Sequence, residues 1–150
     1  MKPRALLALF ARIFVGAVLV YAGASKASAP AEEFALVIGV YDLVPSSITL
    51  PIASLLPWLE LAVGWALILG VRTRAAGAAA GATTLAFLFA IGSVLARGIT
   101  LPNCGCFGES MHFSPPHAFL FDTLLAALCW TICTAQPDPL SLDSWATRGL

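Results

Sequence analysis

The sequence predicts an all-α membrane protein: a four-helix bundle with a short extracytoplasmic Cys-x-Cys loop between the third and fourth helices. Of the 150 residues, 59% are hydrophobic and 11% are charged, with a mean hydropathy of +0.90. A soluble domain carries about 25% charged residues. Four apolar runs approach the roughly 20 residues that cross a bilayer. A polar segment with Cys104 and Cys106 separates the last two runs.

The length and the net charge of the chain further restrict the class of protein. A chain of 150 residues with four spans leaves little room for a second domain, so we expect residues 1–150 to form one. The formal net charge is zero, and no basic run suggests binding to nucleic acid. The expected surroundings are membrane lipid.

The first span is expected at about residues 6–24, after the basic residues Lys2 and Arg4. A basic start before an apolar stretch is also typical of a cleaved signal peptide. We favour a retained helix because the run is long for a signal core and contains Arg12. The apolar part of the next stretch, 25–49, is too short to cross a bilayer, which predicts a short helix at the membrane interface.

The other spans are expected at about residues 50–71, 75–96 and 118–135. The third begins with alanine and glycine, and Gly77 and Gly81 form a small-xxx-small face that predicts close helix packing. The polar tail from Gln136 is expected to be unstructured.

Basic residues near the ends of the spans predict the orientation. One side receives Lys2, Arg4, Arg72, Arg74 and Arg148, and the other side receives Lys26 and Arg97. The excess on the first side places both termini in the cytoplasm. The loop with the two cysteines then faces the extracytoplasmic side, where disulfides are stable.

Cys104 and Cys106 are the candidate catalytic residues. With one residue between them, their Cα atoms can approach within the roughly 4.4–6.8 Å that a disulfide requires. Gly105 supplies the backbone freedom for so small a ring. A strained bridge of this kind exchanges readily with other thiols, which predicts a redox pair. A static disulfide that braces the loop is the alternative.

A metal site is the third interpretation, in which Cys104 and Cys106 combine with His112 and His117. Two thiolates and two imidazoles suit tetrahedral zinc. The single residue between the cysteines is fewer than the usual two to four. We therefore favour disulfide exchange over metal binding.

Charged residues also lie within the predicted spans. Ionisable groups are expensive in lipid, so they face the bundle interior and pair. At a rise of about 1.5 Å per residue, Glu60 lies near the midplane and Arg12 somewhat toward the cytoplasm. These two residues are expected to form an ion pair that locks the bundle, a polar core that binds a quinone head group or relays protons, or both. Lys26 and Asp122 are both expected near the outer surface, where a second pairing is possible.

Cys129 and Cys133 are four residues apart and therefore share one face of the fourth predicted helix. They lie too far from the loop for direct exchange with its cysteines. Buried cysteine usually behaves as a small hydrophobe. We expect both residues to serve in packing.

Several short segments of the chain resemble those of a known family. RIFVG at 12–16 and YAGASK at 21–26 resemble the first helix of the MauE/DoxX family of small bacterial membrane proteins. YDLVP at 41–45 and LPWLEL at 56–61 are similar to its next two blocks. NCGCFG at 103–108 resembles the cysteine signature of the MauE branch in particular.

The resemblance implies a four-helix protein of the bacterial inner membrane with a redox-associated role. In the MauE branch this role is maturation of the disulfide-rich β-subunit of methylamine dehydrogenase, beside a thioredoxin-like partner. Cys104 and Cys106 would exchange disulfides with such an extracytoplasmic partner, and a quinone near Glu60 and Arg12 is the candidate electron carrier. The alternative functions are a non-catalytic assembly factor or anchor for a redox enzyme, and a metal-binding membrane protein.

Overall fold

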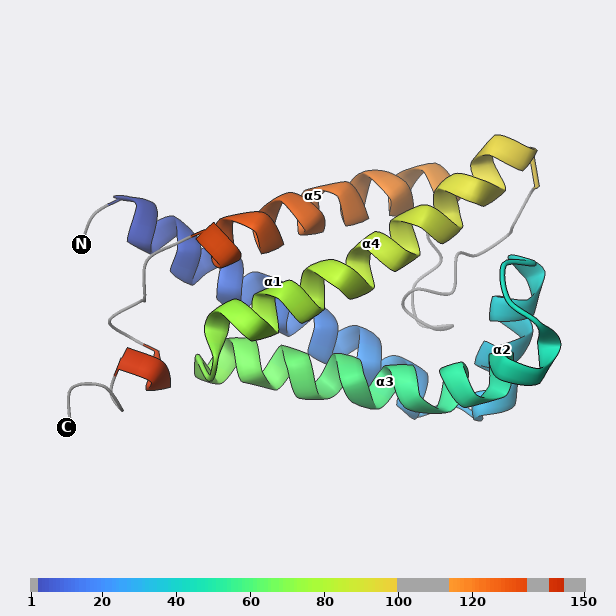
Figure 1. The fold of residues 1–150 in the computed structure, drawn as a ribbon, viewed down its shortest axis with the longest axis horizontal. Helices are drawn as coiled ribbons and strands as arrows, with labels where there is room; N and C mark the ends of the chain where they lie inside the picture. The colour runs from blue at the N-terminus through green and yellow to red at the C-terminus, as the bar shows by residue number, and fades with distance from the viewer. Residues whose placement is uncertain (1–2, 100–113, 135–140, 145–150) are drawn as a thin grey trace.

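The computed structural model describes residues 3–99, 114–134 and 141–144, and these ranges contain helices and no strand (Figure 1). The principal helices are α1 Pro3–Ala27, α2 Ala31–Val40, α3 Ser46–Leu69, α4 Thr73–Arg97 and α5 Pro115–Thr134. All except α2 are long and apolar enough to cross a membrane. The prediction of an all-α protein with four long apolar helices is confirmed. The predicted Cys-x-Cys loop lies outside the described residues.

Each of the four long helices extends beyond its predicted limits at one end or both, and the differences at α1 and α3 are the largest. α3 begins at Ser46, before the expected start at residue 50, and Pro51 lies within it. Membrane helices tolerate an interior proline where neighbouring segments compensate for the lost backbone hydrogen bond. α1 continues to Ala27, beyond the expected end at residue 24, and therefore includes Lys26. The short helix expected in the polar stretch is α2, at the end of the bundle where α3 begins (Figure 1).

α1 and α3 run antiparallel and pack more extensively than any other pair of described helices. A methyl group added at Gly16 would lie 2.9 Å from the carbonyl oxygen of Gly64, and one at Gly64 would lie 2.8 Å from that of Gly16. The two backbones are therefore in contact, an approach that small residues permit in membrane helices. This crossing fixes the register of α1 against α3.

α4 and α5 also pack through small residues. A methyl group added at Gly77 would lie 2.8 Å from Ile132 Cγ2, and one at Gly81 would lie 3.5 Å from Cys129 Cβ. Cys129 is 2% exposed, and Cys133 Sγ lies 3.9 Å from a backbone carbonyl oxygen of α4. The glycine face and both α5 cysteines therefore serve in packing, as predicted.

Large apolar side chains cover the outer surface of the bundle. Phe10, Leu55, Phe89 and Trp130 are each at least 70% exposed and belong to four different helices. In water, an apolar surface of this extent would promote association. Such an exposed apolar surface is typical of helices whose outer faces contact lipid.

Residues 141–144 contradict the expectation that the tail from Gln136 is unstructured, because they pack on the turn between α3 and α4. Asp143 accepts hydrogen bonds from the backbone N–H groups of Arg72 at 2.7 Å and Thr73 at 2.8 Å. Its own N–H donates to the carbonyl oxygen of Gly70 at 3.2 Å. Asp143 thereby caps α4, whose preceding residue Arg72 makes no side-chain cap hydrogen bond. The backbone N–H of Thr73 is the main cause of a lowered pKa at the Asp143 carboxyl.

Candidate functional site: a buried ion pair beside an apolar pocket

Lys26 and Glu60 form a buried ion pair between α1 and α3. Lys26 Nζ donates to Glu60 Oε1 at 2.9 Å and Oε2 at 2.7 Å, and each side chain is 1% exposed. An ammonium has three protons, and the remaining hydrogen bond is a long one, 3.5 Å, to the carbonyl oxygen of Ala22. Removing one member of such a pair leaves an uncompensated buried charge. The pair therefore ties α1 to α3.

The buried face of α1 places Lys26 toward the bundle interior. The residues on this face include Ala8, Arg12, Val15, Leu19, Ala22 and Lys26. Their spacing of three and four residues is that of one helix face. On α3, Glu60 lies 14 residues after Ser46, which corresponds to about 21 Å along the axis. The pair consequently lies well within the length of α3.

Two phenylalanine rings from other helices flank the ammonium group. The centroid of the Phe34 ring, on α2, lies 5.6 Å from Lys26 Nζ, and that of the Phe87 ring, on α4, lies 5.4 Å away. Cation–π attraction operates over these distances and strengthens where water is excluded. The ammonium group therefore contacts side chains from three other helices.

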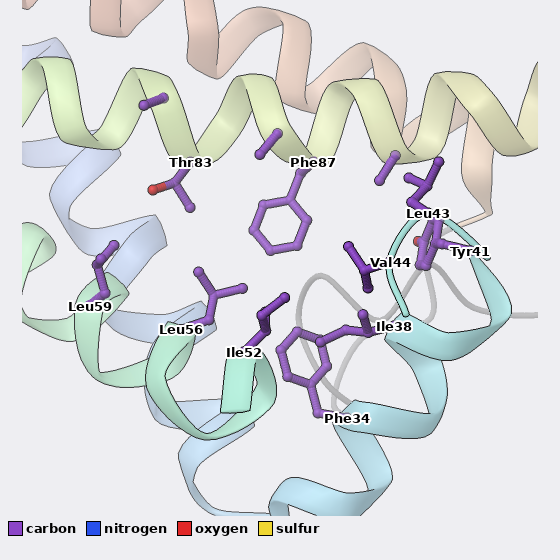
Figure 2. A pocket seen from close by; sticks show the side chains of 13 residues that line it. Phe34, Ile38, Tyr41, Leu43, Val44, Ile52, Leu56, Leu59, Thr83 and Phe87 are labelled. Carbon is purple, nitrogen blue, oxygen red and sulfur yellow. The ribbon is translucent and has the colours of Figure 1, made fainter. Parts of the chain in front are cut away.

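The same two rings line an apolar pocket of about 430 Å³ between α2, α3 and α4 (Figure 2). Most other lining side chains are aliphatic, including Ile52 and Leu56. The Thr83 hydroxyl also lines the pocket, but it donates to a carbonyl oxygen of its own helix at 3.0 Å. The pocket suits an apolar body, and a charged pair lies beside two of its walls.

The predicted pairing of Arg12 with Glu60 is wrong. In the antiparallel register of α1 and α3, Arg12 lies beside the end of α3 rather than its middle. A methyl group added at Gly70 would come 2.6 Å from Arg12 Nη1, and the charge of Arg12 acts on the Asp143 carboxylate. The positions along the helices, estimated without the register, misplaced Arg12 relative to Glu60.

The predicted pairing of Lys26 with Asp122 is also wrong. The Lys26 ammonium group is engaged by Glu60, and Asp122 is buried at 6% exposure on α5. The expectation placed Lys26 outside the first span. In the structure, it is within α1 and on the buried face.

Cys104, Cys106 and His112 lie outside the described residues, so the exchange, brace and metal interpretations remain predictions. His117 is described, and its Nδ1 is hydrogen-bonded to Ser114 Oγ at 2.6 Å. Ser114 precedes the two prolines that open α5, so this contact closes the first turn of the helix. In the described ranges, no group of three or more His, Cys, Asp or Glu side chains is arranged to hold a metal ion.

The four long apolar helices and their internal ion pair define a small helical-bundle membrane protein. The family model described as Methylamine utilisation protein MauE matches residues 4–135. The chain therefore belongs to the MauE family, which confirms the resemblance found in its sequence.

Individual relatives agree with this assignment. The chain is 39% identical to the Methylamine utilization protein MauE of Methylophilus methylotrophus over 99 residues, which cover 66% of the chain and 52% of the relative. It is 33% identical to the protein of the same name in Paracoccus denitrificans over 151 aligned residues, which cover 97% of the chain and 78% of the relative. The match thus spans about half the length of the Methylophilus protein. No solved structure matches the chain.

Proposed function

We propose that this protein is a membrane thiol–disulfide redox protein that supports disulfide formation in extracytoplasmic proteins. Cys104 and Cys106 exchange disulfides with a thioredoxin-like partner. The supporting observation is the family match over residues 4–135, which include both cysteines. Because the relatives are named for methylamine utilisation, the proposed client is a disulfide-rich subunit of a methylamine-oxidising enzyme.

The exchange balances as a two-electron reaction. A thiolate of the reduced partner attacks the Cys104–Cys106 disulfide to form a mixed disulfide, and the second partner thiol resolves it. The partner gains a disulfide, while Cys104 and Cys106 become thiols. A membrane-soluble quinone then accepts two electrons and two protons from these thiols, which restores their disulfide and releases a quinol.

The environment of the two described cysteines supports this choice of redox pair. Cys129 is 2% exposed, and Cys133 packs with it against α4. Access of a partner's thiolate is a requirement for exchange. Cys129 and Cys133 are therefore matched controls for Cys104 and Cys106 within the same chain.

The proposed location is the bacterial inner membrane, with both termini in the cytoplasm. Arg72 and Arg74 lie at the turn between α3 and α4, and basic residues favour the cytoplasmic side. The connection between α4 and α5, which includes Cys104 and Cys106, then faces outward. An oxidising compartment there permits disulfide chemistry.

The test compares Cys104→Ser/Cys106→Ser with Cys129→Ala/Cys133→Ala in cells. The first variant should abolish disulfide formation in the client, and the second should preserve it, as measured by the mass of the client after thiol alkylation. In the wild type, a membrane-impermeant maleimide should label Cys104 and Cys106 only after mild reduction. Client maturation that survives the serine substitutions would overturn the proposal, and continued co-purification with a redox enzyme would then favour the assembly-factor alternative.

A further inference from the structure

The apolar pocket and the buried ion pair meet at Phe34 and Phe87. We propose that this pocket is the quinone site, with the quinone ring beside these phenylalanines and one carbonyl oxygen hydrogen-bonded to Lys26 Nζ. The identity of the ligand rests on the proposed function, because disulfide formation requires a two-electron acceptor. The location rests on the pocket and on the ammonium group of Lys26, which lies behind the two phenylalanine rings of its wall.

The size and lining of the pocket fit a lipid-soluble ring compound. Its volume of about 430 Å³ falls within the roughly 300–1,000 Å³ of small-molecule sites. Phe34, Tyr41 and Phe87 provide aromatic walls, and aliphatic side chains from α3 and α4 complete the lining. Aromatic rings attract one another in offset or edge-to-face arrangements. A planar quinone ring can pack against these walls.

The ion pair supplies the polar feature that a purely apolar ligand would not need. Glu60 holds Lys26 Nζ through two short hydrogen bonds, whereas the bond to Ala22 is 3.5 Å long. A ligand carbonyl can replace this weak third bond without disrupting the pair. Nζ lies 5.4 Å from the centroid of the Phe87 ring, which lines the pocket, so the proposed contact between a ligand carbonyl and the ammonium group requires that this side chain rotate aside. A charged donor also stabilises the negative charge that develops on a quinone oxygen during reduction.

The first test blocks the pocket. Binding of decylubiquinone to the full-length protein in detergent is measured calorimetrically at constant micelle concentration. Ala86 lines the pocket, so Ala86→Phe should weaken binding at least about tenfold by occupying space that the ligand needs. Leu85 is 59% exposed on the outer surface of the same helix, and Leu85→Phe should leave the Kd unchanged. Ala82→Leu, also in the lining, provides a second, smaller obstruction if Ala86→Phe does not fold.

The second test removes the charge. Lys26→Met/Glu60→Met replaces both members and leaves no buried charge without its partner. Loss of one charge-assisted hydrogen bond should weaken decylubiquinone binding about tenfold or more. Decanol, which has a chain but no quinone ring, should bind weakly and respond little to this change. Undiminished quinone binding in the double variant, or equal competition by decanol, would overturn the quinone site and indicate an acyl-chain pocket.

The binding test and the maturation test separate the two proposals. Cys104→Ser/Cys106→Ser should bind decylubiquinone as the wild type does, because the proposed site does not include these residues. If the pocket fails to bind quinone but the cysteines remain essential for client maturation, only the quinone site is wrong. If it binds quinone but the cysteines are dispensable, only the exchange proposal is wrong.

Discussion

Lys26 and Arg12, two buried cations of α1, occupy contrasting surroundings. Lys26 meets the carboxylate of Glu60 inside the bundle, where both side chains are 1% exposed. Arg12 is 4% exposed and lies at the turn between α3 and α4. There Asp143 receives hydrogen bonds from two backbone N–H groups. One carboxylate is satisfied mainly by a side-chain cation, and the other mainly by a helix N-terminus.

The difference follows from what the backbone can offer at each position. Within a helix, the N–H groups are already bonded, so Glu60 must find a side-chain donor. At the start of α4, the first N–H groups have no partner within the helix, and the positive end of the helix dipole favours an anion. We therefore expect loss of one member of the Lys26–Glu60 pair to be more costly than loss of the Asp143 cap.

The largest expected effect is that of Lys26→Met. It leaves Glu60 buried without its cation, and breaking a buried pair in this way costs about 3–5 kcal/mol. The measurement is denaturant-induced unfolding in detergent, followed by circular dichroism.

Lys26→Met/Glu60→Met is the control for this prediction. With both charges replaced by side chains that suit the apolar surroundings, the stability should return to within about 1 kcal/mol of the wild type or exceed it. A double variant less stable than Lys26→Met would show that the packing of these side chains, rather than charge, governs the stability.

The next largest loss of stability is expected for Gly70→Ala, at the opposite end of the bundle. Gly70 has a φ of +72°, and an added methyl group would come 2.6 Å from Arg12 Nη1 and 2.7 Å from Ser141 Cα. The left-handed backbone alone costs about 1–2 kcal/mol for alanine, and the close contacts add to this in the same unfolding experiment. Gly98→Ala is the matched control, because Gly98 has a φ of +67° but nothing within 4 Å of an added methyl group. Equal losses for the two variants would argue against a close contact with Arg12 and Ser141.

The sequence was sufficient for the four long helices because hydropathy is a local property. The length of each apolar run predicts a membrane span independently of the other segments. The glycine face of α4 was also predictable, since Gly77 and Gly81 lie one turn apart on a single helix. The start of α3 was less accurate: the predicted span begins at residue 50, whereas the helix begins at Ser46, directly after Pro45.

The candidate site was less predictable because it depends on the register between helices. Gly16 and Gly64 set this register, and it places Arg12 away from Glu60. The sequence did indicate that Lys26 lies on the buried face of α1, because it continues the spacing of Leu19 and Ala22 along that face. The pocket requires three helices to be placed together, and no single segment predicts that arrangement.

A smaller effect is expected for Asp143→Ala. Loss of the hydrogen bonds to the N–H groups of Arg72 and Thr73 should cost about 1 kcal/mol, the usual value for an N-cap substitution. Asp143→Asn should fall between the alanine variant and the wild type, because its amide oxygen can still accept one of these bonds. The measurement is again denaturant unfolding; an unchanged midpoint in the alanine variant would show that α4 does not depend on this cap.

The smallest effect is the pH dependence of the Asp143 contribution. Backbone N–H donation, chiefly from Thr73, lowers the pKa of the folded-state carboxyl. The stabilisation is therefore present above the unfolded-state pKa and is lost as the pH falls through the lower folded-state pKa. The difference between wild type and Asp143→Ala should stay constant from about pH 7 to about pH 5 and shrink below about pH 4. Unfolding midpoints measured across this range test the sign, and a difference that grows toward acid pH would contradict a cap made by the ionised carboxylate.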